Sequence, residues 1–248
     1  MLQSELQEYL DFKVEQYNTP LFIESDPIQL PHHFSRKEDI EIVAFLVSTI
    51  AWGKRSMIIK NGERLLEIME HSPFEFIQNY KSGELDDFVH RTFNAIDLDF
   101  FFSSLRQIYE NGGLEKAFSE NKHIPGIKGR IVNFRNHFLA TEHLQRSEKH
   151  VSNPLKNSAA KRINMFLRWM VRNDNCGVDF GIWKSISSAE LMIPLDVHTS
   201  VNARELGLLI RKQNDWKALE ELMVNLRKFD PADPAKYDFA LFGIGAFE

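Results

Sequence analysis

The chain has 248 residues and is 43% hydrophobic, which is enough for one large domain or two small ones sharing an interface. No apolar run is long enough to span a bilayer, and the acidic, amphipathic N-terminus differs from a secretory signal, so we expect a cytoplasmic protein with no membrane partner. The single cysteine, Cys176, excludes an internal disulfide framework and a cysteine-built iron–sulfur cluster, and the net charge of -5 argues against nucleic-acid binding by bulk attraction alone.

Helical spacing of apolar residues runs through the chain, without sustained polar–apolar alternation. The first helix is predicted at about 3–16, and a second contains Phe45 and Ile50 before a break at 52–54. Another helix follows that break, and further helices are expected at 73–80, 97–110, 127–141, 157–172, 197–206 and 215–228. The pattern predicts an all-α protein of roughly ten helices.

The domain organisation is expected to be a single compact unit over residues 1–248. The sequence contains no internal repeat, low-complexity tract or linker that would separate independent domains. If the unit has two helical lobes, one would cover about 36–145, and the other would combine 1–35 with 146–248.

A basic stripe stands out in this acidic chain, because "KNSAAKRINMFLRWMVR" from Lys156 to Arg172 has five cations and no acid. On a helix, Phe166 belongs to an apolar face, whereas Arg168 and Arg172 lie one turn apart on another. Either acids from another segment, such as "GELDD", pair with these arginines, or the arginines contact a phosphate-bearing partner. Phe166 and Trp169 are expected in the core rather than stacked on bases.

Two polar residues have both a structural and a chemical interpretation. Asp196, in "IPLDVHTSVNARELGL", can cap the helix that follows it, and a carboxylate there stays ionised and can stabilise a cation or take a proton. Lys161 can be an ordinary surface lysine. Crowding by Arg162 and neighbouring cations would instead favour its neutral amine, which is a nucleophile.

Four segments resemble, in order, the endonuclease III branch of the helix-hairpin-helix DNA glycosylase superfamily: "FLVSTIAWGKRSMIIKNGERLLE", "SAAKRINMFLRW", "PLDVHTSVNARELGL" and "DFALFGIGAF". The sequence is also similar to a bacterial family of uncharacterised proteins with the signature "KRINMFLRWMVR". The first resemblance implies an all-α, two-lobed helix-hairpin-helix fold and a DNA repair glycosylase, with or without AP-lyase activity.

Carried over by position, the resemblance implies that Asp196 is the catalytic aspartate and Lys161 the lysine that forms a Schiff base. Trp52, at the break in "STIAWG", would enter the base stack of a duplex that carries a lesion. We further expect Arg162, Arg168, Arg172 and His198 to contact that DNA substrate. No metal or other cofactor is expected.

The family's hairpin carries glycines just before its lysine, whereas this chain has "SNPLKNSAA" there. The segment "HIPGIKGRIVNF" at 123–134 is either a displaced phosphate-binding hairpin or an ordinary Pro-Gly turn. Two other functions remain open, namely a non-catalytic nucleic-acid-binding protein with the same fold and a helical scaffold without a nucleic-acid role. Salt-dependent binding would separate the first from the second.

Overall fold

The computed structural model describes residues 2–83, 85 and 87–247 and is mainly α-helical, as predicted. The chain forms two compact units. One, here called the terminal unit, combines Met1–Ser25 with Pro154–Glu248, and the other, the central unit, is Asp26–Asn153. The unit boundaries therefore lie at 26 and 153, compared with 36 and 145 expected for two lobes. Within the described residues, no helix is both long enough and apolar enough to span a membrane.

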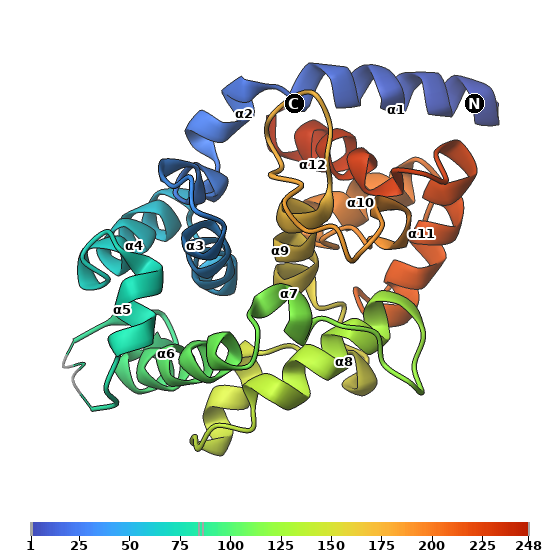
Figure 1. The fold of residues 1–248 in the computed structure, drawn as a ribbon. Coiled ribbons are helices and arrows are strands. Elements are labelled where there is room, and N and C mark those ends of the chain that lie inside the picture. The colour runs from blue at the N-terminus through green and yellow to red at the C-terminus, as the bar shows by residue number, and fades with distance from the viewer. Residues whose placement is uncertain (1, 84, 86, 248) are drawn as a thin grey trace. The chain divides into compact units, whose positions relative to one another are not determined.

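The terminal unit is built around α12 (Tyr237–Phe247), which packs against α1 and α10 (Figure 1). Glycines on α12 permit this close approach, because a Cβ on Gly243 would lie 2.1 Å from Cδ2 of Tyr17, and one on Gly245 would lie 2.7 Å from Nδ2 of Asn202. The other elements of the unit are α1 (Gln3–Tyr17), α2 (Pro20–Ser25), α9 (Lys161–Val171), α10 (Val197–Glu205), α11 (Trp216–Phe229) and short 3-10 turns at Pro154–Lys156, Ser188–Glu190 and Pro234–Lys236.

Most residues of helix α9 are buried. The apolar face predicted for it is confirmed, since Phe166 and Leu167 are fully buried, and the Trp169 ring is buried as well. Phe166 packs edge-on against Trp183, with ring centroids 5.3 Å apart. The polar end of α9, where Lys161 begins the helix, is therefore held on a rigid core.

The central unit has a core of phenylalanines. Phe45 of α3 (Lys37–Ile50) contacts Phe101 of α6 (Ala95–Glu110) and Phe138 of α8 (Gly126–Phe138), with ring centroids 5.8 and 5.3 Å apart. The remaining elements are α4 (Arg55–Ile68), α5 (Pro73–Asn79), β1 (Val89–His90), β2 (Phe93–Asn94), α7 (Leu114–Ala117) and 3-10 turns at Pro27–Gln29, Pro31–His33 and Gln145–His150. The break predicted at 52–54 is confirmed between α3 and α4.

The small antiparallel hairpin of β1 and β2 was not predicted. Val89 pairs with Asn94, and His90 pairs with Phe93. Each strand has only two residues, which is too short for an alternating pattern to appear in the sequence.

Candidate functional site

Lys161 and Asp196 lie side by side in the terminal unit, although 35 positions separate them in the sequence. The Lys161 Nζ is 3.3 Å from Oδ2 of Asp196. Lys161 is the first residue of α9, and Asp196 immediately precedes α10, so the pair joins the N-terminal ends of two helices. The lysine side chain is 38% exposed and the aspartate side chain 12%, which leaves the amine open to solvent and the carboxylate largely enclosed.

Asp196 is also the cap of α10, as the sequence predicted. Its Oδ1 accepts a hydrogen bond of 2.8 Å from the backbone N–H of Thr199. One carboxylate oxygen thus satisfies the helix end and the other faces the Lys161 ammonium. The cap fixes the direction of the carboxylate, so the second oxygen is presented to the lysine without a search over rotamers.

The segment before Lys161 forms a tight turn without glycine. Asn157 and Ala160 both have left-handed backbones, with φ of 63° and 48°. The helix expected at 157–172 therefore begins only at Lys161, because Ala160 is its non-helical cap. The turn is anchored by Asn157, whose Nδ2 donates to Oδ2 of Asp215 over 2.8 Å and whose carbonyl accepts from the N–H of Trp216 over 3.0 Å.

The other glycine-containing candidate for the hairpin, "HIPGIKGRIVNF", starts α8 in the central unit. Pro125 is the cap of this helix, and Gly126 has φ of 66°. Asn121 accepts hydrogen bonds from the backbone N–H groups of His123 and Ile124, at 2.9 and 3.1 Å. These contacts give an ordinary turn into a helix, and they lie in the other unit from Lys161.

Arg168 and Arg172 are not on a solvated face, which corrects the expected geometry of the basic stripe. Both are buried, at 3% and 2% exposure. Arg172 reaches Oδ2 of Asp233 at 2.9 Å and Oδ2 of Asp179 at 3.1 Å. Buried guanidinium groups whose donors are already taken by carboxylates have no surface for phosphates, so neither arginine enters the function proposed below.

These arginines belong to an arginine cluster with four acids, namely Asp174, Asp179, Asp233 and Asp238. Asp174 and Asp179 come from the loop after α9, Asp233 from the segment that leads into α12 and Asp238 from the first turn of α12, not from "GELDD" as the sequence suggested. Of the acids in "GELDD", Glu84 and Asp86 lie outside the described residues, and Asp87 pairs with Arg64 at 2.8 Å. The only sign of this pairing in the sequence was that Asp174 and Asp179 follow the end of α9 closely.

Asp238 connects the arginine cluster electrostatically to Asp196. Arg168 donates through Nη1 to Oδ2 of Asp238, which is buried at the start of α12. Burial raises the pKa of Asp238 to about 7 even though Arg168 opposes the shift, and the negative charges of Asp196 and Asp179 add to it. Sequence analysis missed Asp238 because its partner Arg168 lies 70 positions away in the chain.

The two remaining candidates near the pair occupy different surroundings. Arg162, next to Lys161, is half-buried, and its burial lowers its pKa to about 10. His198 is exposed on the first turn of α10, with its ring edge-on to Phe242 at a centroid distance of 6.4 Å. His198 is thus exposed to solvent two residues after Asp196, whereas Arg162 is partly buried.

Trp52 lies in the central unit, at the break between α3 and α4. The Arg91 guanidinium covers its ring at 4.6 Å, and the His90 ring approaches edge-on at 6.0 Å. His90 also contacts the Trp52 carbonyl through Nε2 at 3.1 Å. The indole is therefore half-buried against the β1–β2 hairpin, and the buried indole N–H has no hydrogen-bond partner among the described residues.

A family model described as a protein of unknown function (DUF2400) matches residues 26–247. The chain belongs to this family. The description agrees with the expectation of an uncharacterised family, and it assigns no activity. Comparison with curated proteins and with solved structures gave no match. Among the described residues, no group of three or more His, Cys, Asp or Glu side chains is arranged to hold a metal ion.

Proposed function

We propose that this protein is a DNA glycosylase that removes a damaged or mispaired base by means of Lys161 and Asp196. The observation that carries the proposal is the 3.3 Å contact between their side chains, at the starts of two separate helices. These are the two residues to which the sequence resemblance assigns the reaction. An ordinary ion pair would explain the contact alone, but it would not explain why the resemblance selects the same two residues.

Asp196 would stabilise the sugar as the base departs. The bond between C1′ and the base is out of reach inside a duplex, so the nucleotide has to be extruded first. When that bond breaks, the base leaves with the electron pair and takes up a proton, and positive charge develops on C1′ and the ring oxygen. A carboxylate held in place by the Thr199 N–H and largely shielded from water stabilises that charge without reorganising.

Lys161 would form the covalent intermediate. Once the base has left, the Lys161 ammonium gives up a proton, for which the Asp196 carboxylate is the adjacent acceptor. The free amine then bonds to C1′, and opening of the C1′–O4′ bond with loss of a further proton to solvent gives an imine to Nζ. Removal of a proton from C2′ breaks the bond between C3′ and the phosphate oxygen. Water finally releases the lysine by hydrolysing the imine.

The surroundings of Trp52 support a nucleic-acid partner. Trp52 lies in the break between α3 and α4, and a base that took the place of the Arg91 guanidinium over its ring would gain about 1–3 kcal/mol from stacking. Gly53 and Lys54 beside it are exposed. In this proposal Trp52 is the residue of the central unit that contacts the nucleic acid.

The test is incubation with duplexes that carry abasic, oxidised, deaminated or alkylated bases, scored separately for base release and strand cleavage. Wild type should process at least one duplex, and Asp196→Asn should lower its rate by about 100-fold or more, because removing preorganised charge stabilisation costs about 3–4 kcal/mol. Lys236→Ala is the matched control, since Lys236 pairs with Asp230 at 2.9 Å in the same unit.

Other results of this experiment would favour one of the two alternative functions, a non-catalytic nucleic-acid-binding protein or a helical scaffold. Salt-dependent binding to all duplexes without any base release would make this a non-catalytic nucleic-acid-binding protein. Folded protein that binds no duplex would leave the scaffold interpretation. Retention of full activity in Asp196→Asn would reduce Asp196 to a helix cap.

A further inference from the structure

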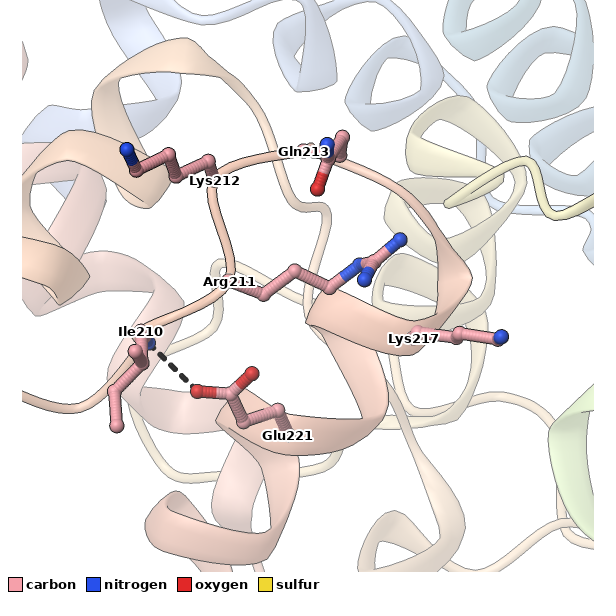
Figure 2. Close-up of a pocket in the computed structure, with 6 residues that line it drawn as sticks. All are labelled: Ile210, Arg211, Lys212, Gln213, Lys217 and Glu221. Atoms are coloured by element: carbon pink, nitrogen blue, oxygen red, sulfur yellow. Dashed lines mark hydrogen bonds between the residues drawn. The ribbon is translucent and has the colours of Figure 1, made fainter.

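The loop between α10 and α11 forms a cationic depression in the terminal unit, shown in Figure 2. Gly207, with φ of 72°, ends α10, and the N–H of Leu208 bonds back to the carbonyl of Ala203 at 2.8 Å. The chain then runs over the surface until α11 begins at Trp216. The depression has a volume of about 600 Å³ and is lined by Ile210, Arg211, Lys212, Gln213, Lys217 and Glu221.

This loop is held rigidly, unlike most exposed loops. The Arg204 guanidinium donates from Nε to the carbonyl of Arg211 at 2.9 Å and from Nη2 to the carbonyl of Lys212 at 3.0 Å. Glu221 accepts from the N–H of Ile210 at 2.6 Å (Figure 2). Because its backbone is already ordered, the loop would lose little conformational entropy when a ligand binds to it.

The charges of the loop suit a polyanion. Asp215 engages Arg211, with contacts of 2.7 and 2.5 Å, and Glu221 is occupied by the backbone. Lys212 and Lys217 are exposed, and no carboxylate of the described residues pairs with either ammonium group. Figure 2 shows their side chains extending away from the loop and from the start of α11. Ile210 is 85% exposed beside them.

The loop is tied to the segment that leads to Lys161. Asp215, at the end of the loop, accepts the 2.8 Å hydrogen bond from Asn157, which lies four residues before Lys161. Ser158 and Asp215 also form an antiparallel backbone bridge. The segment before Lys161 and the end of the loop are therefore bonded to each other. A ligand bound at Lys161 that extends along this segment reaches the loop.

We propose that the loop between α10 and α11 is a second contact for the nucleic acid whose nucleotide reaches Lys161 and Asp196. Lys212 and Lys217 bind backbone phosphates, and Ile210 packs against a sugar. The inference rests on the proposed function for the identity of the ligand. Charge selects this ligand, because Lys212 and Lys217 are both exposed and, among the described residues, pair with no carboxylate, in a chain of net charge -5.

The test measures binding of a fluorescent duplex with a tetrahydrofuran abasic analogue over a series of salt concentrations. Each lost phosphate contact reduces the magnitude of the negative slope of log K against log salt by about 0.9. Lys212→Gln/Lys217→Gln should therefore make the slope shallower by about 1–2 and weaken binding by about tenfold or more at low salt. The matched control is Lys184→Gln/Lys228→Gln, which removes two exposed cations from elsewhere in the same unit and should leave the slope unchanged. Ile210→Ser should weaken binding without changing the slope.

A loop variant with the slope and affinity of the control would overturn the inference. If wild type nevertheless releases a base, only the loop assignment fails and the proposed function stands. If wild type processes no lesion but the loop variant still loses affinity, the proposed reaction fails and the nucleic-acid contact stands. Binding of poly-glutamate through Lys212 and Lys217, without binding of the duplex, would overturn the inference in favour of an acidic protein partner.

Discussion

Replacing Arg172 by methionine should strongly destabilise the fold, because this residue neutralises three carboxylates inside the terminal unit. Arg172 is 2% exposed, and its guanidinium lies 2.5 Å from Asp174, 2.9 Å from Asp233 and 3.1 Å from Asp179. Methionine preserves most of the length and apolar contact of the side chain but leaves the acids without this partner. Asp179 keeps a contact with Arg168 at 3.2 Å, so its charge remains partly compensated.

Removing one partner of a buried ion pair costs about 3–5 kcal/mol, and we expect this variant to fall in that range. Such a loss is a large part of the roughly 5–15 kcal/mol by which domains are stable. Urea unfolding followed by circular dichroism should show a midpoint lower by roughly 1–2 M. The control is Arg64→Met, whose pair with Asp87 is exposed and which should cost less than about 1 kcal/mol.

The effect of Arg172→Met should also depend on pH. Burial tends to raise the pKa of Asp174, but hydrogen bonds from Asn18 and Arg172 and the Arg172 charge lower it overall. The stability from this acid is therefore present above its unfolded pKa and is lost as the pH falls through its folded value. The difference in unfolding free energy between wild type and Arg172→Met should therefore become smaller at acidic pH. A loss below about 1 kcal/mol, or a gap that widens in acid, would refute the reasoning.

Three further substitutions test other parts of the structure by urea unfolding. Ala160→Gly should stabilise by up to about 1 kcal/mol, because φ of 48° strains an alanine, and destabilisation would mean the strain is absent. Gly243→Ala should cost about 1–3 kcal/mol, since the new Cβ would meet Tyr17 at 2.1 Å, and a neutral result would contradict the close packing of α12. Burial raises the pKa of Asp238 from 3.8 to about 7, so the folded state holds a proton that the unfolded state has lost, and wild type loses stability as pH rises through that range. The stability of Asp238→Asn should therefore rise relative to that of wild type between about pH 4 and 7. A difference in stability that stays constant over this range would exclude the raised pKa of Asp238.

Periodicity predicted those parts of the fold that depend on local sequence. The apolar face of α9 and the break before α4 follow from residues three and four apart, and the Asp196 cap follows from the helix it precedes. The start of α9 was placed four residues early, because an alanine gives no sign that it takes a left-handed backbone. That conformation is imposed by the bonds that Asn157 makes with Asp215 and Trp216, which are far away in the chain.

The arginines show why the candidate site was only partly predictable. From sequence, Arg168 and Arg172 had no acids among their helical neighbours, so a solvent-facing stripe was a reasonable interpretation. Their partners Asp233 and Asp238 are 61 and 70 positions away, and only tertiary packing brings the charges together. The contact between Lys161 and Asp196 also spans distant segments, and it was expected solely because of the family resemblance.

The most direct test of the proposed chemistry is borohydride trapping on a duplex that carries an abasic site. Reduction of the imine should link wild type to the DNA, and peptide mapping should place the link on Lys161. Lys161→Ala should give no adduct, whereas Lys236→Ala, with a comparable ion pair to Asp230, should trap as wild type does. An adduct formed equally well by Lys161→Ala, or mapped to another lysine, would contradict the assignment of Lys161 as the nucleophile.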